Sequence, residues 1–178
     1  MLRLNRLLDE PLSKPEAERA VTLRLAYGER VKSRLATMSV DGQAVAILLP
    51  RGSVLRDGAL LAGDDGALAR IEAAPEPVIR VTADDPLALL RAVYHLANRH
   101  VPAQLAIDHA LIEPDAVLEA MLRGLGVHVE HIEAPFHPEG GAYHGEHHHG
   151  PSHRDEVDIV SATIGEQLSI AAHAGRRT

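Results

Sequence analysis

Residues 84–102 leave the chain little conformational freedom, because their sequence describes one helix with both of its ends marked. The triplet Asp84-Asp85-Pro86 combines a carboxylate that can cap a helix with a proline suited to the first helical turn. Leu89, Val93 and Leu96 then recur at i, i+4 and i+7, which is the spacing of one buried helical face. We therefore expect a helix that packs against the protein core along one side.

The end of this helix is also predicted by the sequence. Asn98 tolerates the left-handed conformation that often terminates a helix. Pro102 pushes Val101 towards an extended conformation, so the helix cannot continue far. His100 therefore lies at the helix exit, where we expect the backbone to hold it in place.

The chain before this helix is built of short segments that alternate apolar and polar residues, separated by Asp-Gly and Pro-Arg-Gly turn signals. Strands are expected at residues 21–25, 34–40, 43–49, 54–55, 59–61 and 67–73. Residues 1–74 are thus predicted to form a small all-β domain, and the prolines in residues 73–77 indicate a short linker. Charge changes at the same point, since residues 1–74 hold 11 basic and 10 acidic side chains and residues 75–137 hold 4 and 9.

The second predicted domain, residues 75–137, alternates strands and helices. Strands are expected at residues 78–82, 103–107, 110–112 and 127–132, with a second helix at residues 114–125. The apolar face expected for that second helix is Val117, Leu118, Met121, Leu122 and Leu125. The resulting order βαββαβ is that of a ferredoxin-like domain, so the chain as a whole is predicted to be α+β.

The last part of the chain, residues 138–178, has a different character and is expected to be a flexible tail. Five of the chain's 12 histidines crowd into ten of its residues, among glycine and glutamate. They are His144, His147, His148, His149 and His153. Neutral imidazole suits Ni²⁺, Zn²⁺ and Cu²⁺, so we predict metal binding here rather than a merely solvated tail. The residues alone do not rank Ni²⁺ above Zn²⁺.

Composition and motifs exclude several classes of function. The formal net charge of −7 argues against a nucleic-acid partner and against an anionic membrane surface. No apolar run approaches 18 residues and no signal sequence is recognisable, so we expect a cytoplasmic protein. The absence of cysteine removes disulfides and thiolate ligands. No His-Glu-x-x-His helix, phosphate-binding loop or Gly-x-Ser-x-Gly elbow is present, and we predict no enzymatic activity.

Residues 94–102, Tyr-His-Leu-Ala-Asn-Arg-His-Val-Pro, resemble the signature of the UreE family of urease accessory proteins, which are nickel metallochaperones. Residues 49–58 resemble the corresponding family segment. The resemblance implies a homodimer in which His100 and its symmetry mate bind one Ni²⁺, with tail histidines at the open positions. It also implies delivery of nickel to apo-urease together with a GTPase accessory protein of the UreG type.

Other interpretations remain open from the residues themselves. A lone histidine such as His100 is often structural, half-buried and satisfied by nearby backbone. A passive buffer or storage protein would bind Ni²⁺ or Zn²⁺ through the tail and transfer it to no partner. A metal-dependent enzyme is a third, weaker hypothesis. In the metallochaperone interpretation, residues 1–74 would dock a partner, with Arg51, Arg56 and the group Arg30, Lys32 and Arg34 as candidate contacts.

Overall fold

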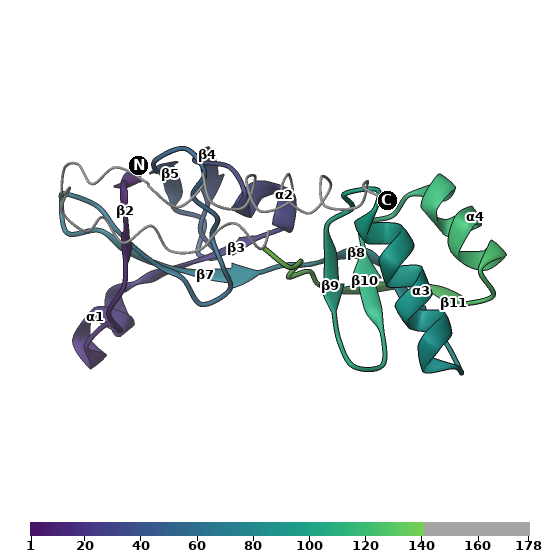
Figure 1. Ribbon diagram of the computed structural model, residues 1–178. Helices are drawn as coiled ribbons and strands as arrows, with labels where there is room; N and C mark the ends of the chain where they lie inside the picture. Colours follow the sequence, from purple (N-terminus) through teal and green to yellow (C-terminus); the bar gives the residue numbers. More distant parts are fainter. Residues whose placement is uncertain (141–178) are drawn as a thin grey trace, which may run out of the picture. The chain divides into compact units, whose positions relative to one another are not determined.

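A computed structural model describes residues 1–140 (Figure 1). It contains an N-terminal β-rich domain and a C-terminal α/β domain, which confirms the predicted fold class. The five histidines of the predicted metal-binding tail lie outside the described residues. Among the residues described, no helix is both long enough and apolar enough to cross a membrane.

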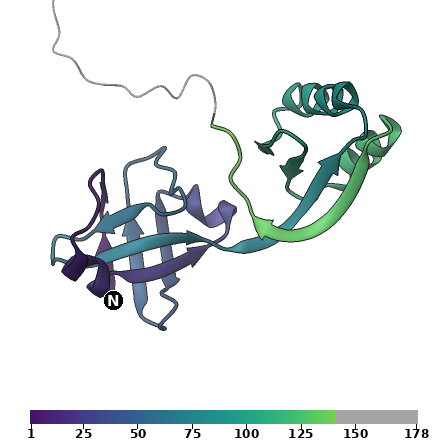
Figure 2. The same cartoon turned by 90° about the horizontal axis from the view of Figure 1, so that it is seen from below.

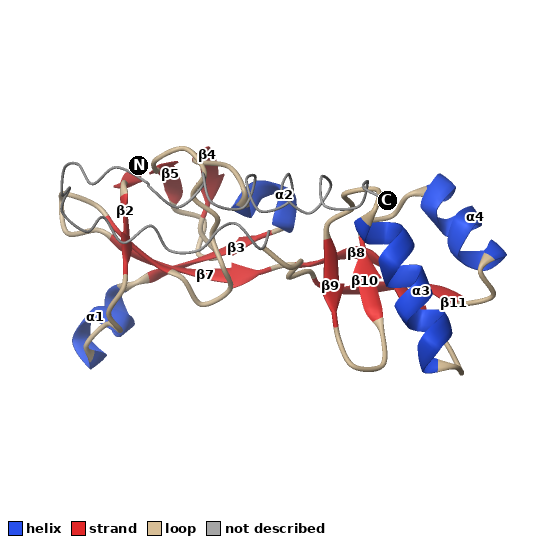
Figure 3. Cartoon of the chain, in the orientation of Figure 1, coloured by secondary structure: helices blue, strands red, loops and turns tan. Residues whose placement is uncertain are grey.

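The N-terminal domain contains two mixed sheets (Figures 1 and 3). Its strands are β1 Leu2–Leu4, β2 Arg6–Leu8, β3 Val21–Leu25, β4 Arg34–Met38, β5 Ala44–Leu48, β6 Leu60–Ala62 and β7 Leu68–Ala73. One sheet has the order β1-β5-β4 and the other β2-β6-β7-β3. The pairs β1–β5 and β3–β7 are parallel, and the remaining neighbours are antiparallel.

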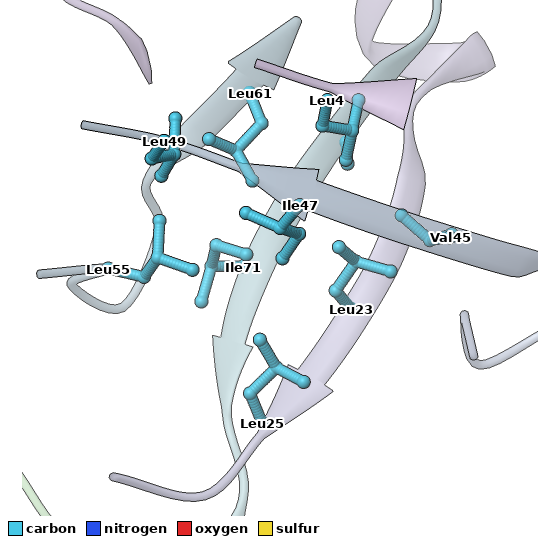
Figure 4. Packing of buried hydrophobic residues seen from close by; sticks show 10 residues of the cluster. Leu4, Leu23, Leu25, Val45, Ile47, Leu49, Leu55, Leu61 and Ile71 are labelled. Atoms are coloured by element: carbon cyan, nitrogen blue, oxygen red, sulfur yellow. The ribbon is translucent and has the colours of Figure 1, made fainter. Parts of the chain in front are cut away.

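Buried aliphatic side chains from both sheets form one core in this domain. Figure 4 shows Leu4, Ile47 and Leu61, which come from three different strands, converging in that core. The alternation that predicted the strands explains this, because every second side chain of a strand points to the same face. In β5, for example, Val45 and Ile47 are fully buried while their neighbours are not.

Several local features of this domain were missed or wrongly predicted. The strands β1 and β2 have only three residues each, too few to show a period. Two short helices, α1 Lys14–Arg19 and α2 Tyr27–Arg30, interrupt the expected all-β order. The first could have been recognised from its capping signal, since the Glu16 carboxylate accepts a hydrogen bond from the Ser13 N–H at 2.9 Å. The strand expected at residues 54–55 does not form.

The prediction of a proline-rich linker at residues 73–77 was also wrong. Strand β8, Pro75–Thr82, begins one residue after β7 ends, and its prolines lie inside the strand. Pro75 pairs with Pro135 and Pro77 pairs with Glu133. On its other side β8 pairs with a strand only from Ile79 to Val81, so the prolines occupy a stretch where one edge is free. A strand tolerates proline at such edge positions.

The C-terminal domain has the predicted βαββαβ order. After β8 come α3 Pro86–Ala97, β9 Ala103–Leu105, β10 Ala110–Ile112, α4 Ala116–Gly124 and β11 His128–Pro135. The sheet order β11-β8-β10-β9 is antiparallel throughout, and Figure 2 shows β11 curving alongside β8. Both helices pack on one face of this sheet, since residues of α3 and α4 share a buried cluster with β8 and β10.

The boundaries of helix α4 and of strand β9 differ from the prediction. Helix α4 begins at Ala116, because Asp115 caps it by accepting hydrogen bonds from two backbone N–H groups, and Pro114 lies before the helix. Val117 was expected on the buried face of α4 but is 78% exposed. Strand β9 ends at Leu105 rather than at residue 107, and the residues after Leu105 turn towards β10.

Two isoleucines of the C-terminal domain offer a matched test of this fold. Ile112 is fully buried between the sheet and the helices, whereas Ile107 is fully exposed in the turn after β9. We expect Ile112→Ala to lower the free energy of unfolding by about 2–5 kcal/mol, through lost burial and the cavity that remains. Ile107→Ala should change it by less than about 0.5 kcal/mol. Urea unfolding measures both, and equal effects would contradict the assigned core.

Candidate metal site

The candidate site depends on how α3 begins and ends. At its start the Asp85 carboxylate accepts a hydrogen bond from the Leu87 N–H at 3.0 Å, and Pro86 occupies the first turn as predicted. Along the helix, Leu89 and Leu96 are buried against the sheet. The packed face therefore holds the helix in place as far as its last turn.

Two backbone hydrogen bonds close the C-terminal end of α3. The N–H of His100 donates to the carbonyl of Ala97 at 3.0 Å, and the N–H of Val101 donates to the carbonyl of Leu96 at 3.3 Å. This pair of bonds is the Schellman motif, which requires a left-handed residue just after the helix. His100 is that residue, with φ of 55°, and no other non-glycine residue among residues 1–140 has a positive φ.

The helix ends at Asn98 as predicted, but Asn98 itself does not adopt the left-handed conformation that suggested this end. Asn98 keeps right-handed helical angles, with φ of −66° and ψ of −9°, although the helix does end there. Its side-chain amide instead donates to the carbonyl of Tyr94 at 2.8 Å. The left-handed residue comes two positions later, where Val101 can pack against the cluster that contains Leu96.

The left-handed conformation of His100 is energetically unfavourable. It costs an L-residue with a Cβ atom about 1–2 kcal/mol, which is why glycine usually occupies this position. Such strain is often found at functional sites, where the surrounding structure holds a residue in one orientation. The motif thus fixes the direction in which the His100 side chain leaves the backbone.

The surroundings of His100 also distinguish it from a structural histidine. His100 is exposed, and its imidazole has no hydrogen bond or ion pair within the described part of the chain. The half-buried, backbone-satisfied histidine considered from the sequence is therefore not what the structure contains. His95, on the last turn of α3, is partly buried and packs edge-on against the Tyr94 ring at 5.6 Å.

Three other histidines each contact a carboxylate. The pairs are His109 with Asp108 at 2.7 Å, His128 with Asp84 at 3.4 Å, and His131 with Glu119 at 3.0 Å. The hydrogen bond from His109 lowers the pKa of Asp108 below its usual value. The hydrogen bond from His131 and the nearby charge of Arg123 likewise lower the pKa of Glu119. Asp108 and Glu119 thus already accept hydrogen bonds from neighbouring histidines.

Within residues 1–140, no three His, Asp or Glu side chains lie close enough together to hold a metal ion. A metal at His100 would therefore need ligands from outside this part of the chain. The predicted tract from His144 to His153 lies outside the described residues, so its role as a ligand stays a prediction.

An exposed apolar stripe runs along α3 on the side opposite its buried face. Leu87, Leu90 and Tyr94 are 50%, 65% and 66% exposed, and they recur at i, i+3 and i+7. A helix of a soluble domain usually presents polar residues on its outer side. This stripe leads towards the turn that carries His100 and is a candidate contact surface.

One of the basic residues proposed for partner docking is not available at the surface. Arg30 is only 2% exposed, so its guanidinium cannot serve as an outer contact. Lys32, Arg34, Arg51 and Arg56 are exposed.

Two family descriptions match most of the chain. The N-terminal domain of the UreE urease accessory protein matches residues 3–74, and its C-terminal domain matches residues 76–158. The chain belongs to the UreE family. The two matches meet where β7 ends and β8 begins.

Similar members of the UreE family come from several bacteria. The urease accessory protein UreE of Burkholderia lata is 58% identical over 150 residues, which cover 83% of this chain and 72% of the relative. Its counterpart from Ralstonia nicotianae is 48% identical over 91% of this chain and 78% of the relative. The one from Cupriavidus necator is 47% identical over 91% and 85% respectively.

The strain at His100 can be tested without any metal. His100→Gly and His100→Ala both remove the imidazole, but only glycine adopts the left-handed conformation freely. We expect the glycine variant to be more stable than the alanine variant by about 1 kcal/mol. Chemical denaturation of the two variants measures this difference. An alanine variant as stable as the glycine variant would show that the turn carries no strain.

Proposed function

We propose that this member of the UreE family is a nickel metallochaperone of urease assembly. In this proposal, the chain forms a homodimer in which His100 and its symmetry mate bind one Ni²⁺ as cargo. Tail histidines complete the coordination, and the metal passes to the urease apoprotein. No residue is assigned a catalytic role.

The observation that carries the proposal is the state of His100. It is exposed, lacks a side-chain partner in residues 1–140, and is held in a left-handed turn that a glycine would fill at lower cost. The adjacent stripe of Leu87, Leu90 and Tyr94 supports a homodimer, because a two-fold contact through such a surface would duplicate a nearby residue. One histidine per chain would then supply two imidazoles to one metal.

The donor set suits a metal that must later be released. Two imidazoles leave coordination positions open, in contrast to a closed structural site. The chain has no cysteine, so no thiolate would hold the metal tightly in place. Imidazole accepts Zn²⁺ and Cu²⁺ as well as Ni²⁺, and family membership is what favours nickel.

The chain geometry lets a tail histidine reach this metal. The N–H of Glu139 donates to the carbonyl of Ala103 at 2.9 Å, so the start of the tail lies beside a residue close to His100. His144 follows Glu139 by five residues, a contour of up to about 17 Å, while His100 precedes Ala103 by three residues, or about 10 Å at most. The tail is therefore long enough for its first histidine to contribute a ligand.

Partner binding is proposed to involve the N-terminal domain. The exposed side chains Lys32, Arg34, Arg51 and Arg56 are candidate contacts for an acidic surface of the urease complex or of its GTPase accessory protein. Exposed charges of this kind mainly set association rates and specificity.

Calorimetric titration with Ni²⁺ tests the site directly. We expect the whole chain, and a truncation that ends at Gly141, to retain a tight site with about one Ni²⁺ per two chains. His100→Gly should lose that site in both backgrounds, since it removes the shared imidazoles but preserves the turn. A His100→Gly chain that binds like the parent, combined with a truncation that binds nothing, would instead indicate a passive buffer based on the tail.

The pH dependence of nickel binding tests imidazole ligation. A protonated imidazole cannot coordinate a metal, so affinity should fall as pH drops through about 6.5, the ordinary pKa of histidine. Below that value, each coordinating imidazole should weaken binding by about tenfold per pH unit. Titrations between about pH 8 and pH 5.5 measure this, and a flat affinity over that range would rule out histidine ligands.

A further inference from the structure

The residues that follow β11 are held in a defined path by buried contacts. Phe136 is fully buried and packs with Val78 and Leu111. The ring of Tyr27, at the start of α2, meets the Phe136 ring edge-on, with centroids 5.3 Å apart. Phe136 therefore ties the end of β11 to a helix of the N-terminal domain.

A buried arginine adds a polar contact at the same place. The guanidinium of Arg30 donates hydrogen bonds to the carbonyl of Phe136 and, at 3.4 Å, to that of Leu55. It also lies 5.6 Å from the centre of the Tyr27 ring. Burial lowers the pKa of Arg30, while the negative charges of Glu76 and Asp57 act in the opposite direction.

Burying this guanidinium is costly, and Arg30 is not one of the side chains that form the aliphatic core of the N-terminal domain. A charged group taken out of water is tolerated only where specific partners compensate it. Nε of Arg30 has no hydrogen-bond partner among the described residues, so the compensation is incomplete. The partner that lies farthest away in sequence is the Phe136 carbonyl, 106 residues from Arg30.

Two further hydrogen bonds fix the next residues against β9. The N–H of His137 donates to the side-chain oxygen of Gln104 at 2.7 Å. The N–H of Glu139 donates to the carbonyl of Ala103 at 2.9 Å. Strand β9 is the edge strand opposite β11 in the order β11-β8-β10-β9. Within residues 135–139 the chain thus passes from one edge strand of the sheet to the other, which is the one that follows His100.

We propose that Arg30, Gln104 and the Ala103 carbonyl form a tail anchor, which fixes the origin of the histidine tract beside His100. Arg30 is then a positioning residue that never touches the metal. This inference rests on the proposed function and specifies how the tail is presented to that site. The anchor makes a tail histidine an intramolecular ligand with a raised effective concentration.

The size of this effect follows from the length of the tether. With the anchor intact, five residues lead from Glu139 to His144; with both bonds to β9 removed, eight lead from the buried Phe136 to His144. Effective concentration falls with about the −3/2 power of tether length, which gives a loss of about twofold. The tether would then also start beside β11, at the opposite edge of the sheet from β9, which lowers the effective concentration further. We expect a loss of nickel affinity between about twofold and tenfold.

Glu139 offers a matched pair of variants that leaves the buried core untouched. Glu139→Pro removes the N–H that donates to Ala103, whereas Glu139→Ala keeps that N–H and removes only the carboxylate. Gln104→Ala removes the acceptor for His137. We expect Glu139→Pro combined with Gln104→Ala to weaken Ni²⁺ binding of the whole chain by the predicted factor, and Glu139→Ala to bind like the parent. Arg30→Met removes the contact to the Phe136 carbonyl but leaves both bonds to β9, so alone it should weaken binding less than the combined variant.

A second parent chain, without tail histidines, distinguishes an effect on tail position from a general loss of structure. The same variants are placed in a full-length chain whose five tail histidines are replaced by alanine, and Ni²⁺ calorimetry is repeated. If the anchor acts through the tail, the variants have no effect there, while His100→Gly still abolishes the remaining site.

Two results would overturn the tail anchor: parent-like affinity of the anchor variants in the whole chain, or a loss that persists without tail histidines.

Arg24→Met serves as control, since Arg24 pairs with Glu72 on the same domain but has no contact with residues 136–139. If His100→Gly changes nothing in either background, the proposed function itself fails, and this outcome is distinct from failure of the anchor alone.

Discussion

The two backbone hydrogen bonds that close α3 determine where the imidazole of His100 lies. They run from His100 to Ala97 and from Val101 to Leu96, and they exist only because His100 is left-handed. Leu96 is almost fully buried, so the position of the turn is fixed by the packing of α3 on the sheet. The direction of an exposed side chain is in this way set by the packing of a buried one.

In the proposed function, His100 lowers the stability of its turn and supplies a metal ligand. Glycine at position 100 would relieve the strain of the left-handed turn, and an aliphatic residue would supply no ligand. Proteins keep such strained residues where their orientation is used, and the rest of the fold compensates the cost. Here the compensation comes from the capped start of α3 and from its buried face of Leu89, Ala92 and Leu96.

The structure also connects parts of the chain that are remote in sequence. Strand β8 follows β7 after a single residue, and Phe136 returns from β11 to contact Tyr27 and Arg30. These contacts link α2 to the segment from which the histidine tract departs. The two domains are thus joined by packed side chains as well as by the short connection between β7 and β8.

Local sequence was enough to determine much of the C-terminal domain. The capping triplet before α3, the helical spacing of its apolar residues and the alternation in the strands each depend on neighbours a few residues apart, and they predicted the βαββαβ order. The family resemblance around His100 was likewise local. In the N-terminal domain, by contrast, β1 and β2 were missed, because each has three residues and no Asp-Gly turn signal beside it. The equally short β6 lies between two such signals and was predicted.

Tertiary structure alone decided the rest. The residues around Arg30 in the sequence do not predict that its guanidinium is buried against the carbonyl of Phe136, 106 residues away. That contact depends on how whole elements pack. The prolines at 75 and 77 suggested a linker, yet pairing with β11 made them part of a strand. Asparagine was the better local candidate for the left-handed residue, but the packing of Val101 with the Leu96 cluster moved that conformation to His100. Sequence therefore specified which histidine ends the helix, and the packed core specified the direction in which its side chain points.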